Sequence, residues 1–201
     1  MVEAPPLVLA STSPFRRRML EAAGLSFEVL SPDVDEASFK RGCCSSGAAP
    51  GAIAEALACA KAEAVSRRMP GTLVIGADQV LALGDELFDK PADLAIAREQ
   101  LLRLRGRAHQ LHTAAALSLD GRIVWSHVES ATLVMRSFSN ELLEGYLAAM
   151  GSRLCQIVGG YEIEGRGIQL FERVDGDHFT VIGLPLLALL AELRNRGVLE
   201  T

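Results

Sequence analysis

Short apolar runs alternate with stretches of helical periodicity along most of the chain. The expected buried strands of the first half are Leu7–Ala10, residues 27–30 and residues 73–75. Each is brief, apolar and bounded by turn-forming residues, as buried strands usually are. Helices are predicted between them at residues 14–23 and 52–68, the first with Ser13 as N-cap and Pro14 at its opening position. This alternation predicts an α/β fold with a mixed sheet.

The second half of the chain adds hairpins to this pattern. The pairs Gly84-Asp85, Asp120-Gly121 and Asp175-Gly176 separate β-prone runs at residues 80–83 and 86–88, 110–119 and 122–135, and 169–174 and 178–182. Further helices are expected at residues 93–104, 139–150 and 186–196. Residues 40–51 are rich in Gly, Ser, Cys and Ala, which predicts a mobile loop. With no internal repeat and no clear linker, residues 1–201 are interpreted as a single domain.

Composition narrows the class of protein. The 201 residues are 49 % hydrophobic and 22 % charged, enough for a sizeable core. A net charge of −5 argues against non-specific nucleic-acid binding, which needs a basic face. No membrane partner or signal peptide is expected, because no apolar run approaches about 20 residues and the N-terminus lacks a basic region. Four cysteines without C-x-x-C spacing suit a reduced, cytoplasmic protein.

The turn that follows the first strand is a candidate phosphate site. The chain contains neither G-x-x-x-x-G-K-[ST] nor G-x-G-x-x-G, so the two common phosphate fingerprints are absent. Ser11-Thr12-Ser13-Pro14 nevertheless places hydroxyl groups at a helix N-terminus, where unpaired N–H groups and the helix dipole attract anions. Arg16–Arg18 add positive charge. The competing interpretation is an ordinary capped helix with a solvated basic face.

Carboxylates and lysines elsewhere in the chain fit the same chemistry. Glu36 closes an acidic cluster in a loop, and Asp78 stands at the expected end of an apolar strand, where sites of open α/β sheets gather. Mg²⁺ commonly uses one or two carboxylates and shares its other positions with water and phosphate. Lys61 and Lys90 could neutralise phosphate charge. Each residue alone is more often a solvated surface group, but their combination favours a phosphate site.

Other reactive side chains are interpreted as structural or incidental. His109 and His112 lie on opposite faces of an expected strand, which suits metal binding badly. Cys43 and Cys44 sit in the predicted loop with nothing nearby to stabilise a thiolate.

Six stretches in order along the chain resemble the Maf family of nucleotide pyrophosphatases. They are L-V-L-A-S-T-S-P-F-R-R-R-M-L from Leu7, S-P-D-V-D-E from Ser31, V-I-G-A-D-Q-V from Val74, D-K-P from Asp89, Y-E-I-E-G-R-G-I-Q-L-F-E-R from Tyr161 and G-L-P-L from Gly183. The resemblance implies an elongated mixed β-sheet flanked by helices, with two lobes around a cleft, and often a homodimer. It also implies hydrolysis of nucleoside triphosphates between the α- and β-phosphates with a divalent cation, Mg²⁺ or Mn²⁺.

The resemblance assigns roles residue by residue. Asp78 would accept the proton of the attacking water, and Glu36 would hold the metal together with Asp78. The triphosphate would be bound by Ser13, Arg16, Lys61 and Lys90. A carboxylate beside a metal suits this reaction, since phosphoryl transfer depends mainly on positioning and charge neutralisation.

Three positions separate the branches of the family by the base that they accept. The branch acting on dTTP and UTP usually shows Arg, Thr and Gln where this chain has Phe15, Gln79 and Glu164. The chain is more similar to the 7-methyl-GTP pyrophosphatase branch, which typically carries Trp, Gln and Glu. An enzyme acting on dTTP and UTP, or on a broad range of nucleotides, is one alternative. A non-enzymatic nucleotide-binding regulator of septum formation is another.

Overall fold

The computed structural model describes residues 5–200 and divides into two compact units. The first unit comprises residues 5–79, 113–129 and 177–200, and the second comprises residues 80–112 and 130–176. The strands β3, β5 and β6 contribute residues to both units. None of the helices within residues 5–200 is long and apolar enough to cross a membrane.

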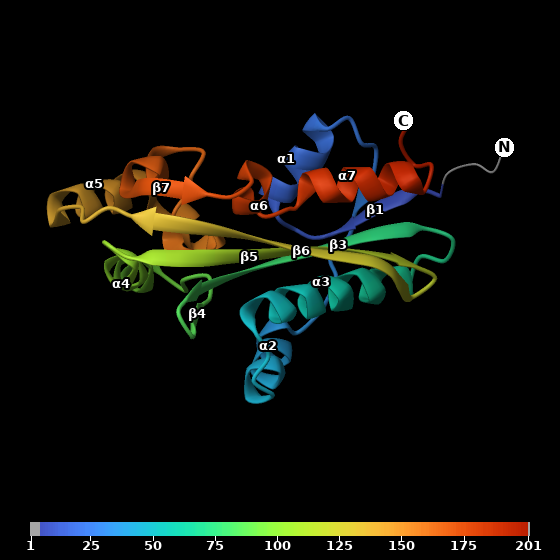
Figure 1. Ribbon diagram of the computed structural model, residues 1–201, viewed down its shortest axis with the longest axis horizontal. Helices are drawn as coiled ribbons and strands as arrows, with labels where there is room; N and C mark the ends of the chain where they lie inside the picture. The colour runs from blue at the N-terminus through green and yellow to red at the C-terminus, as the bar shows by residue number, and fades with distance from the viewer. Residues whose placement is uncertain (1–4, 201) are drawn as a thin grey trace. The chain divides into compact units, whose positions relative to one another are not determined.

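A seven-stranded mixed sheet forms the centre of the fold (Figure 1). Its strands are β1 (Leu7–Ala10), β2 (Glu28–Val29), β3 (Leu73–Leu83), β4 (Glu86–Phe88), β5 (Ala108–Leu119), β6 (Arg122–Met135) and β7 (Phe171–Asp175). They follow the order β2-β1-β3-β5-β6-β7, with β4 paired to β3. β1 runs parallel to β2 and β3, whereas β4 and β7 run antiparallel to β3 and β6. The predicted α/β class with a mixed sheet and flanking helices is confirmed.

Seven α-helices and three short 3₁₀ helices complete the described chain. The α-helices are α1 (Pro14–Ala22), α2 (Glu36–Ser45), α3 (Pro50–Ser66), α4 (Leu94–Leu104), α5 (Asn140–Met150), α6 (His178–Ile182) and α7 (Leu186–Asn195). The 3₁₀ helices are η1 (Gly151–Gln156), η2 (Val158–Gly160) and η3 (Arg166–Leu170). The five helices predicted from periodicity and capping residues are confirmed to within two residues at each end.

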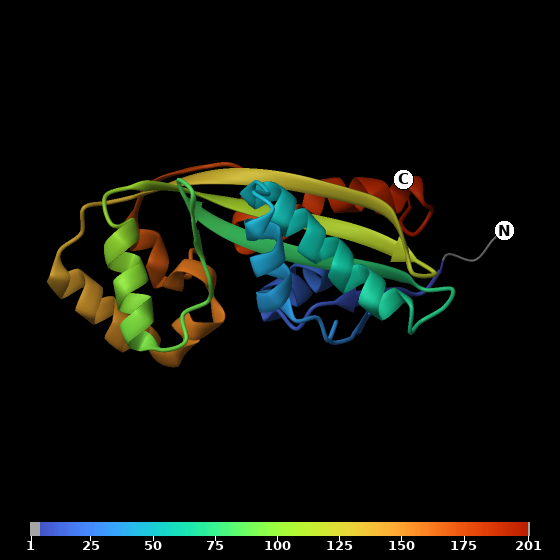
Figure 2. The same cartoon turned by 90° about the horizontal axis from the view of Figure 1, so that it is seen from below.

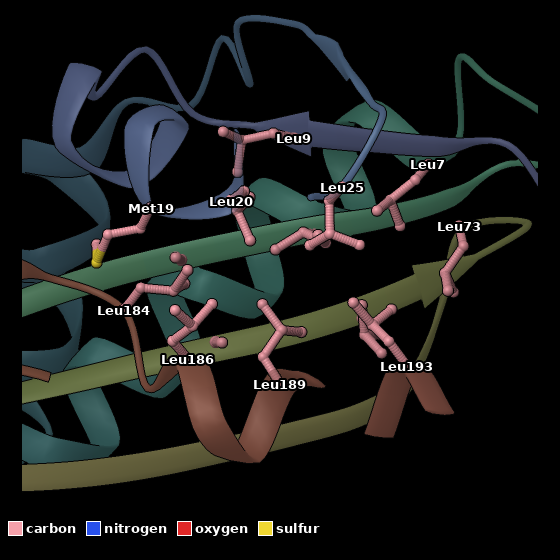
Figure 3. Packing of buried hydrophobic residues seen from close by; sticks show 14 residues of the cluster. Leu7, Leu9, Met19, Leu20, Leu25, Leu73, Leu184, Leu186, Leu189 and Leu193 are labelled. Atoms are coloured by element: carbon pink, nitrogen blue, oxygen red, sulfur yellow. The ribbon is translucent and has the colours of Figure 1, made fainter. Parts of the chain in front are cut away.

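In the first unit, helices cover both faces of the sheet. α1 and α7 lie on one face and α3 lies along the other (Figures 1 and 2). Strand β1 is therefore apolar throughout: Leu7 and Leu9 belong to the cluster under α1 and α7, and Val8 and Ala10 pack with Val65 of α3. The larger cluster interleaves leucines from β1, α1 and α7 (Figure 3). A strand buried on both faces lacks alternation, which is why its short apolar run was recognisable.

Gly76 lets α3 approach β3 closely. A Cβ on this residue would lie 2.1 Å from the carbonyl oxygen of Ala58 and 2.7 Å from the amide nitrogen of Ala62, both in the backbone of α3. No side chain fits at that distance. The glycine is thus required by helix–strand packing.

The expectation that β3 ends before Gly76 is wrong. The strand continues to Leu83, so Asp78 and Gln79 lie inside it and not after it. Glycine and polar residues usually end apolar strands, which explains the misreading. Here the glycine accommodates α3, and the polar residues have partners on the neighbouring elements.

The predicted mobile loop at residues 40–51 is also wrong. Most of it is helical: α2 extends to Ser45, and Pro50 opens α3. Asp35 caps α2 by accepting a hydrogen bond from the Ser38 amide at 3.0 Å. α2 buries none of its side chains, so it shows no apolar stripe in the sequence. Cys43 and Cys44 lie in this helix as free thiols.

Residues 178–182 form helix α6 and not the predicted strand. Asp177 caps the helix by accepting from the Thr180 amide at 2.8 Å, and Gly183 follows it with φ of +128°. The β-branched side chains of this segment favoured a strand, but the capping residue and the glycine decide its local structure. The second predicted strand is shorter than expected and consists of Glu28–Val29.

The second unit has a small aromatic core around His109. The His109 Nε2 atom lies 2.8 Å from the Tyr161 hydroxyl, and the rings of Tyr161 and Phe171 pack against the imidazole. Burial lowers the pKa of His109 to about 4, so the ring is neutral at pH 7. His112 contacts the Ser130 hydroxyl at 2.8 Å. These contacts agree with the structural interpretation of both histidines.

Replacing Gly76 by alanine tests the close packing of α3 on β3. We expect Gly76→Ala to lower the free energy of unfolding by about 3 kcal/mol or more, because the added methyl group meets rigid backbone. Gly145 in α5 is the control, since a Cβ there meets nothing within 4 Å. Gly145→Ala should instead stabilise the protein by up to about 1 kcal/mol. Urea denaturation measures both, and equal stability of the Gly76→Ala and wild-type proteins would contradict the packing argument.

Candidate active site

A buried ion pair joins α3 to β3. The ammonium nitrogen of Lys61 lies 2.5 Å from Oδ1 of Asp78, and the two side chains are only 6 % and 10 % exposed. Alternate residues of a strand share a face. Asp78 therefore lies on the same face as Gly76, where α3 comes closest. The sequence predicted both residues as site residues but not their direct contact.

Glu36, on a third element, also contacts Lys61. It is the first residue of α2, and its Oε1 atom lies 2.8 Å from the same Lys61 nitrogen. Its side chain is 55 % exposed, unlike those of the other two residues. Lys61 thus holds two carboxylates that would otherwise repel one another, one buried and one open to solvent.

The N-terminus of α1 lies where β1 ends. Ala10 is the last residue of β1 and pairs with Gly76, so Asp78 lies beyond the end of its neighbouring strand. Ser13 caps α1, as predicted, with its hydroxyl near the Arg16 amide at 3.5 Å. Ser11 is buried and accepts a hydrogen bond from the Ser13 amide at 3.3 Å. The first turn of the helix therefore presents N–H and hydroxyl groups at this edge of the sheet.

Arg16 reaches from α1 toward the carboxylates. Its Nε donates to the carbonyl oxygen of Gly183 at 2.8 Å, and one terminal nitrogen donates to Ser11 Oγ at 3.3 Å. Burial lowers the pKa of Arg16, and the negative charges of Asp78 and Glu36 oppose that shift. An arginine remains protonated even so. Arg16, Lys61, Asp78 and Glu36 form what we call the charged cluster.

Gln79 occupies the opposite face of β3 from Asp78. Its amide nitrogen contacts the hydroxyl of Thr113 on β5 at 2.9 Å and the carbonyl oxygens of Thr180 and Val181 in α6 at 3.0 and 3.1 Å. Neither Thr113 nor Thr180 was predicted from the sequence. Thr113 precedes three alanines in an expected strand, and a polar residue beside such an apolar run is a usable signal. Thr180 gave none, because its segment was expected to be a strand.

Phe15 follows Pro14 in the first turn of α1 and is partly buried. The guanidinium carbon of Arg18 lies 5.0 Å from the centre of its ring, in a cation–π contact. One face of Phe15 is therefore already covered by a cation. A stacked base would have to use the other face or displace Arg18.

Lys90 and Glu164 belong to the second compact unit. Lys90 is exposed and follows β4. Glu164 is exposed in the turn between η2 and η3. Their predicted roles at the nucleotide stay predictions.

The carboxylates of the charged cluster suit a hard divalent cation. No group of three or more His, Cys, Asp or Glu side chains within residues 5–200 could hold a metal ion. Asp78 and Glu36 supply two hard oxygen donors. This donor set fits Mg²⁺ or Mn²⁺ bound by two carboxylates, with water and phosphate oxygens in the other positions.

Known proteins match nearly the whole length of the chain. The family described as Maf-like protein matches residues 6–196. A protein of Mesorhizobium japonicum named 7-methyl-GTP pyrophosphatase is 50 % identical over 194 residues, which cover 96 % of this chain and 98 % of the relative. A protein of Caulobacter vibrioides named nucleoside triphosphate pyrophosphatase is 48 % identical over 194 residues, covering 96 % and 97 %.

Both matches extend over the strands and helices that carry the charged cluster and Gln79. Identity is near one half over nearly the full length of both chains. With the family match over residues 6–196, this confirms the resemblance drawn from the sequence motifs: the chain belongs to the Maf family.

Proposed function

We propose that this chain is a nucleoside triphosphate pyrophosphatase that cleaves between the α- and β-phosphates, with 7-methyl-GTP as its preferred substrate. The observation that carries the proposal is the charged cluster at the end of β1, where Lys61 contacts both Asp78 and Glu36 beside the N-terminus of α1. The relatives named as pyrophosphatases support the reaction. The products are a nucleoside monophosphate and pyrophosphate.

Each residue of the charged cluster has a task in this reaction. Asp78 accepts the proton of the attacking water on Oδ2, because Lys61 already contacts Oδ1. Lys61 and Arg16 orient phosphate oxygens, and Ser13 adds the N-terminal N–H groups of α1. Lys90 is proposed to bind the same triphosphate. A non-enzymatic regulator would not need a buried carboxylate beside phosphate-binding groups.

The charges of the cluster support a requirement for a divalent cation. Lys61 and Arg16 carry two positive charges, and Asp78 and Glu36 carry two negative ones, so the cluster as a whole is neutral. A neutral group orients a triphosphate but does not offset its charge. Asp78 and Glu36 would hold Mg²⁺ or Mn²⁺, which would supply the missing positive charge and make a bound water more acidic.

The preference for 7-methyl-GTP rests on Phe15, Gln79 and Glu164. Guanine offers paired N–H donors to a carboxylate, whereas uracil and thymine offer one N–H flanked by carbonyl oxygens. Methylation at N7 makes the base cationic, which favours both an aromatic ring and a negative charge nearby. Relatives named 7-methyl-GTP pyrophosphatase support this choice over dTTP and UTP. A homodimer, a cytoplasmic location and a single functional domain are further proposals.

The products and the metal requirement test the reaction. With 7-methyl-GTP we expect pyrophosphate and 7-methyl-GMP in equal amounts, and loss of turnover in EDTA that returns with Mg²⁺ or Mn²⁺. Ion chromatography of the nucleotides and phosphates measures both. Release of single phosphates, or full activity in EDTA, would contradict the proposal.

Replacing Asp78 by asparagine tests the proton acceptor. Asparagine is close in shape but neither accepts the proton nor offers an anionic ligand, so kcat should fall at least 10²- to 10⁴-fold, as for loss of a general base. Asp85, exposed in the β3–β4 turn, gives the matched control Asp85→Asn, which should keep wild-type kcat. Circular dichroism checks the fold of each variant. A folded Asp78→Asn protein with near-normal kcat would remove Asp78 from the mechanism.

Replacing Glu164 by glutamine tests base choice. Wild type should prefer 7-methyl-GTP to GTP, dTTP and UTP, and Glu164→Gln should lose much of that preference, since a guanine N–H group left without an acceptor in the complex costs about 1–3 kcal/mol. The exposed Glu172 of β7 gives the control Glu172→Gln. The measurement is kcat/KM for the four nucleotides. If Glu164→Gln keeps the wild-type ratio of 7-methyl-GTP to pyrimidine substrates, Glu164 does not read the base.

A further inference from the structure

The amide group of Gln79 has only one orientation that its neighbours allow. Three acceptors surround the nitrogen Nε2: the Thr113 hydroxyl and the carbonyl oxygens of Thr180 and Val181. Backbone carbonyls cannot donate, so neither would tolerate the amide oxygen in that place. The nitrogen must therefore face Thr113 and α6.

Thr113 supports this orientation of the Gln79 amide because its only hydroxyl proton is already donated to another group. Its hydroxyl donates to the Thr180 carbonyl at 2.9 Å, and its oxygen can then only accept from Gln79. An exchange of the amide nitrogen and oxygen would put two acceptors together and break three contacts. Both N–H groups of the amide are thus occupied by the protein.

The carbonyl partners in α6 are themselves held in place. Thr180 is buried, and its hydroxyl donates to Oε2 of Glu129 on β6 at 2.5 Å. Its amide donates to Asp177 at 2.8 Å. These bonds fix the turn of α6 that presents both carbonyls to Gln79. The orientation of the amide is built into the unit before any ligand arrives.

The amide oxygen of Gln79 lies on the side of Arg16. A Cβ at Gly183 would lie 3.9 Å from Gln79 Oε1 and 3.8 Å from Arg16 Nε, so both side chains border the same glycine. Arg16 also donates to the Gly183 carbonyl. The atom that Gln79 presents beside this predicted triphosphate-binding residue is therefore an oxygen.

We propose that Gln79 contacts the nucleotide only as a hydrogen-bond acceptor, and that Thr113 is the positioning residue that enforces this role. The proposal rests on the proposed nucleotide hydrolysis. Gln79 then selects an N–H or O–H donor, which a guanine N1–H or N2–H₂ group or a ribose hydroxyl provides. It cannot donate to a carbonyl such as guanine O6, because its own N–H groups are occupied.

Substrate analogues that lack one group at a time test the acceptor role. GTP is compared with inosine triphosphate, 1-methyl-GTP, 2′-deoxy-GTP and 3′-deoxy-GTP, each without one donor, and with 6-thio-GTP, whose sulfur is a weak acceptor in place of O6. The kcat/KM values are measured for wild type and Gln79→Met. These arms separate base donors from ribose donors.

One donor-lacking analogue should lose about 10- to 100-fold in kcat/KM relative to GTP with wild type, and at most about threefold with Gln79→Met. The ratio of GTP to 6-thio-GTP should be the same for both proteins. The acceptor role would be overturned if the ratio of GTP to 6-thio-GTP differed between wild type and Gln79→Met. It would also be overturned if Gln79→Met left the ratio of GTP to every donor-lacking analogue unchanged. If wild type has the same kcat/KM for GTP and for every donor-lacking analogue, that result alone overturns the acceptor role.

Thr113 variants test the positioning role. Thr113→Val should reduce the donor-dependent ratio toward that of Gln79→Met, whereas Thr113→Ser, which keeps the hydroxyl, should retain it. The buried Thr72, just before β3, gives the control Thr72→Val, which should leave the ratio unchanged. A purely structural role would lower activity on all analogues equally. A full wild-type ratio in Thr113→Val would overturn the assignment.

Failure of the proposed hydrolysis would be recognised separately. Pyrophosphate release by wild type reports the reaction, while the ratios between analogues report the contact of Gln79. If wild type releases no pyrophosphate, dissociation constants of the same nucleotides give the same ratios. Equal dissociation constants across the series would then overturn the acceptor role independently.

Discussion

The ion pair between Lys61 and Asp78 is the interaction on which the rest of the site depends. An isolated ammonium or carboxylate that is nine-tenths buried would be strongly destabilising, and each of these groups is tolerated because the other lies 2.5 Å away. The pair requires α3 to lie against β3, and Gly76 permits that approach. Such pairs seldom add net stability. Its retention in the core is better explained by the chemistry that a buried carboxylate with a fixed position can perform.

Glu36 shows how the same lysine connects the buried and exposed parts of the site. Lys61 lies between a carboxylate of the core and one that is half open to solvent. With Arg16 nearby, positive and negative charges balance within the cluster. Balanced charge stabilises the protein without ligand, but leaves the triphosphate charge to be offset by something that arrives with it. The proposed cation dependence rests on this balance as much as on the type of the ligands.

The sequence predicted the local features of the fold better than the long-range ones. Capping residues such as Ser13, Asp93 and Ser139 located helices because a cap is a contact between near neighbours. The continuation of β3 through Gly76 and Asp78 was missed, since it depends on α3, which is distant in the chain. For the site, the motifs identified Asp78, Lys61, Glu36 and Arg16, which the structure brings together. They did not include Thr113, whose proposed role comes from its contact with Gln79 on the neighbouring strand.

Asp78 and Gln79 are neighbours in β3, so the proposed proton transfer and the proposed nucleotide contact depend on the position of the same strand. Neighbouring residues of a strand face opposite sides of the sheet, so β3 presents the proposed proton acceptor toward α3 and the proposed nucleotide contact toward α6. A slip of one residue in register would exchange these faces. Two features oppose such a slip: only a glycine fits against α3 at position 76, and only a charged partner satisfies Lys61 two residues later. The packing that places the proposed proton acceptor therefore also places the proposed nucleotide contact.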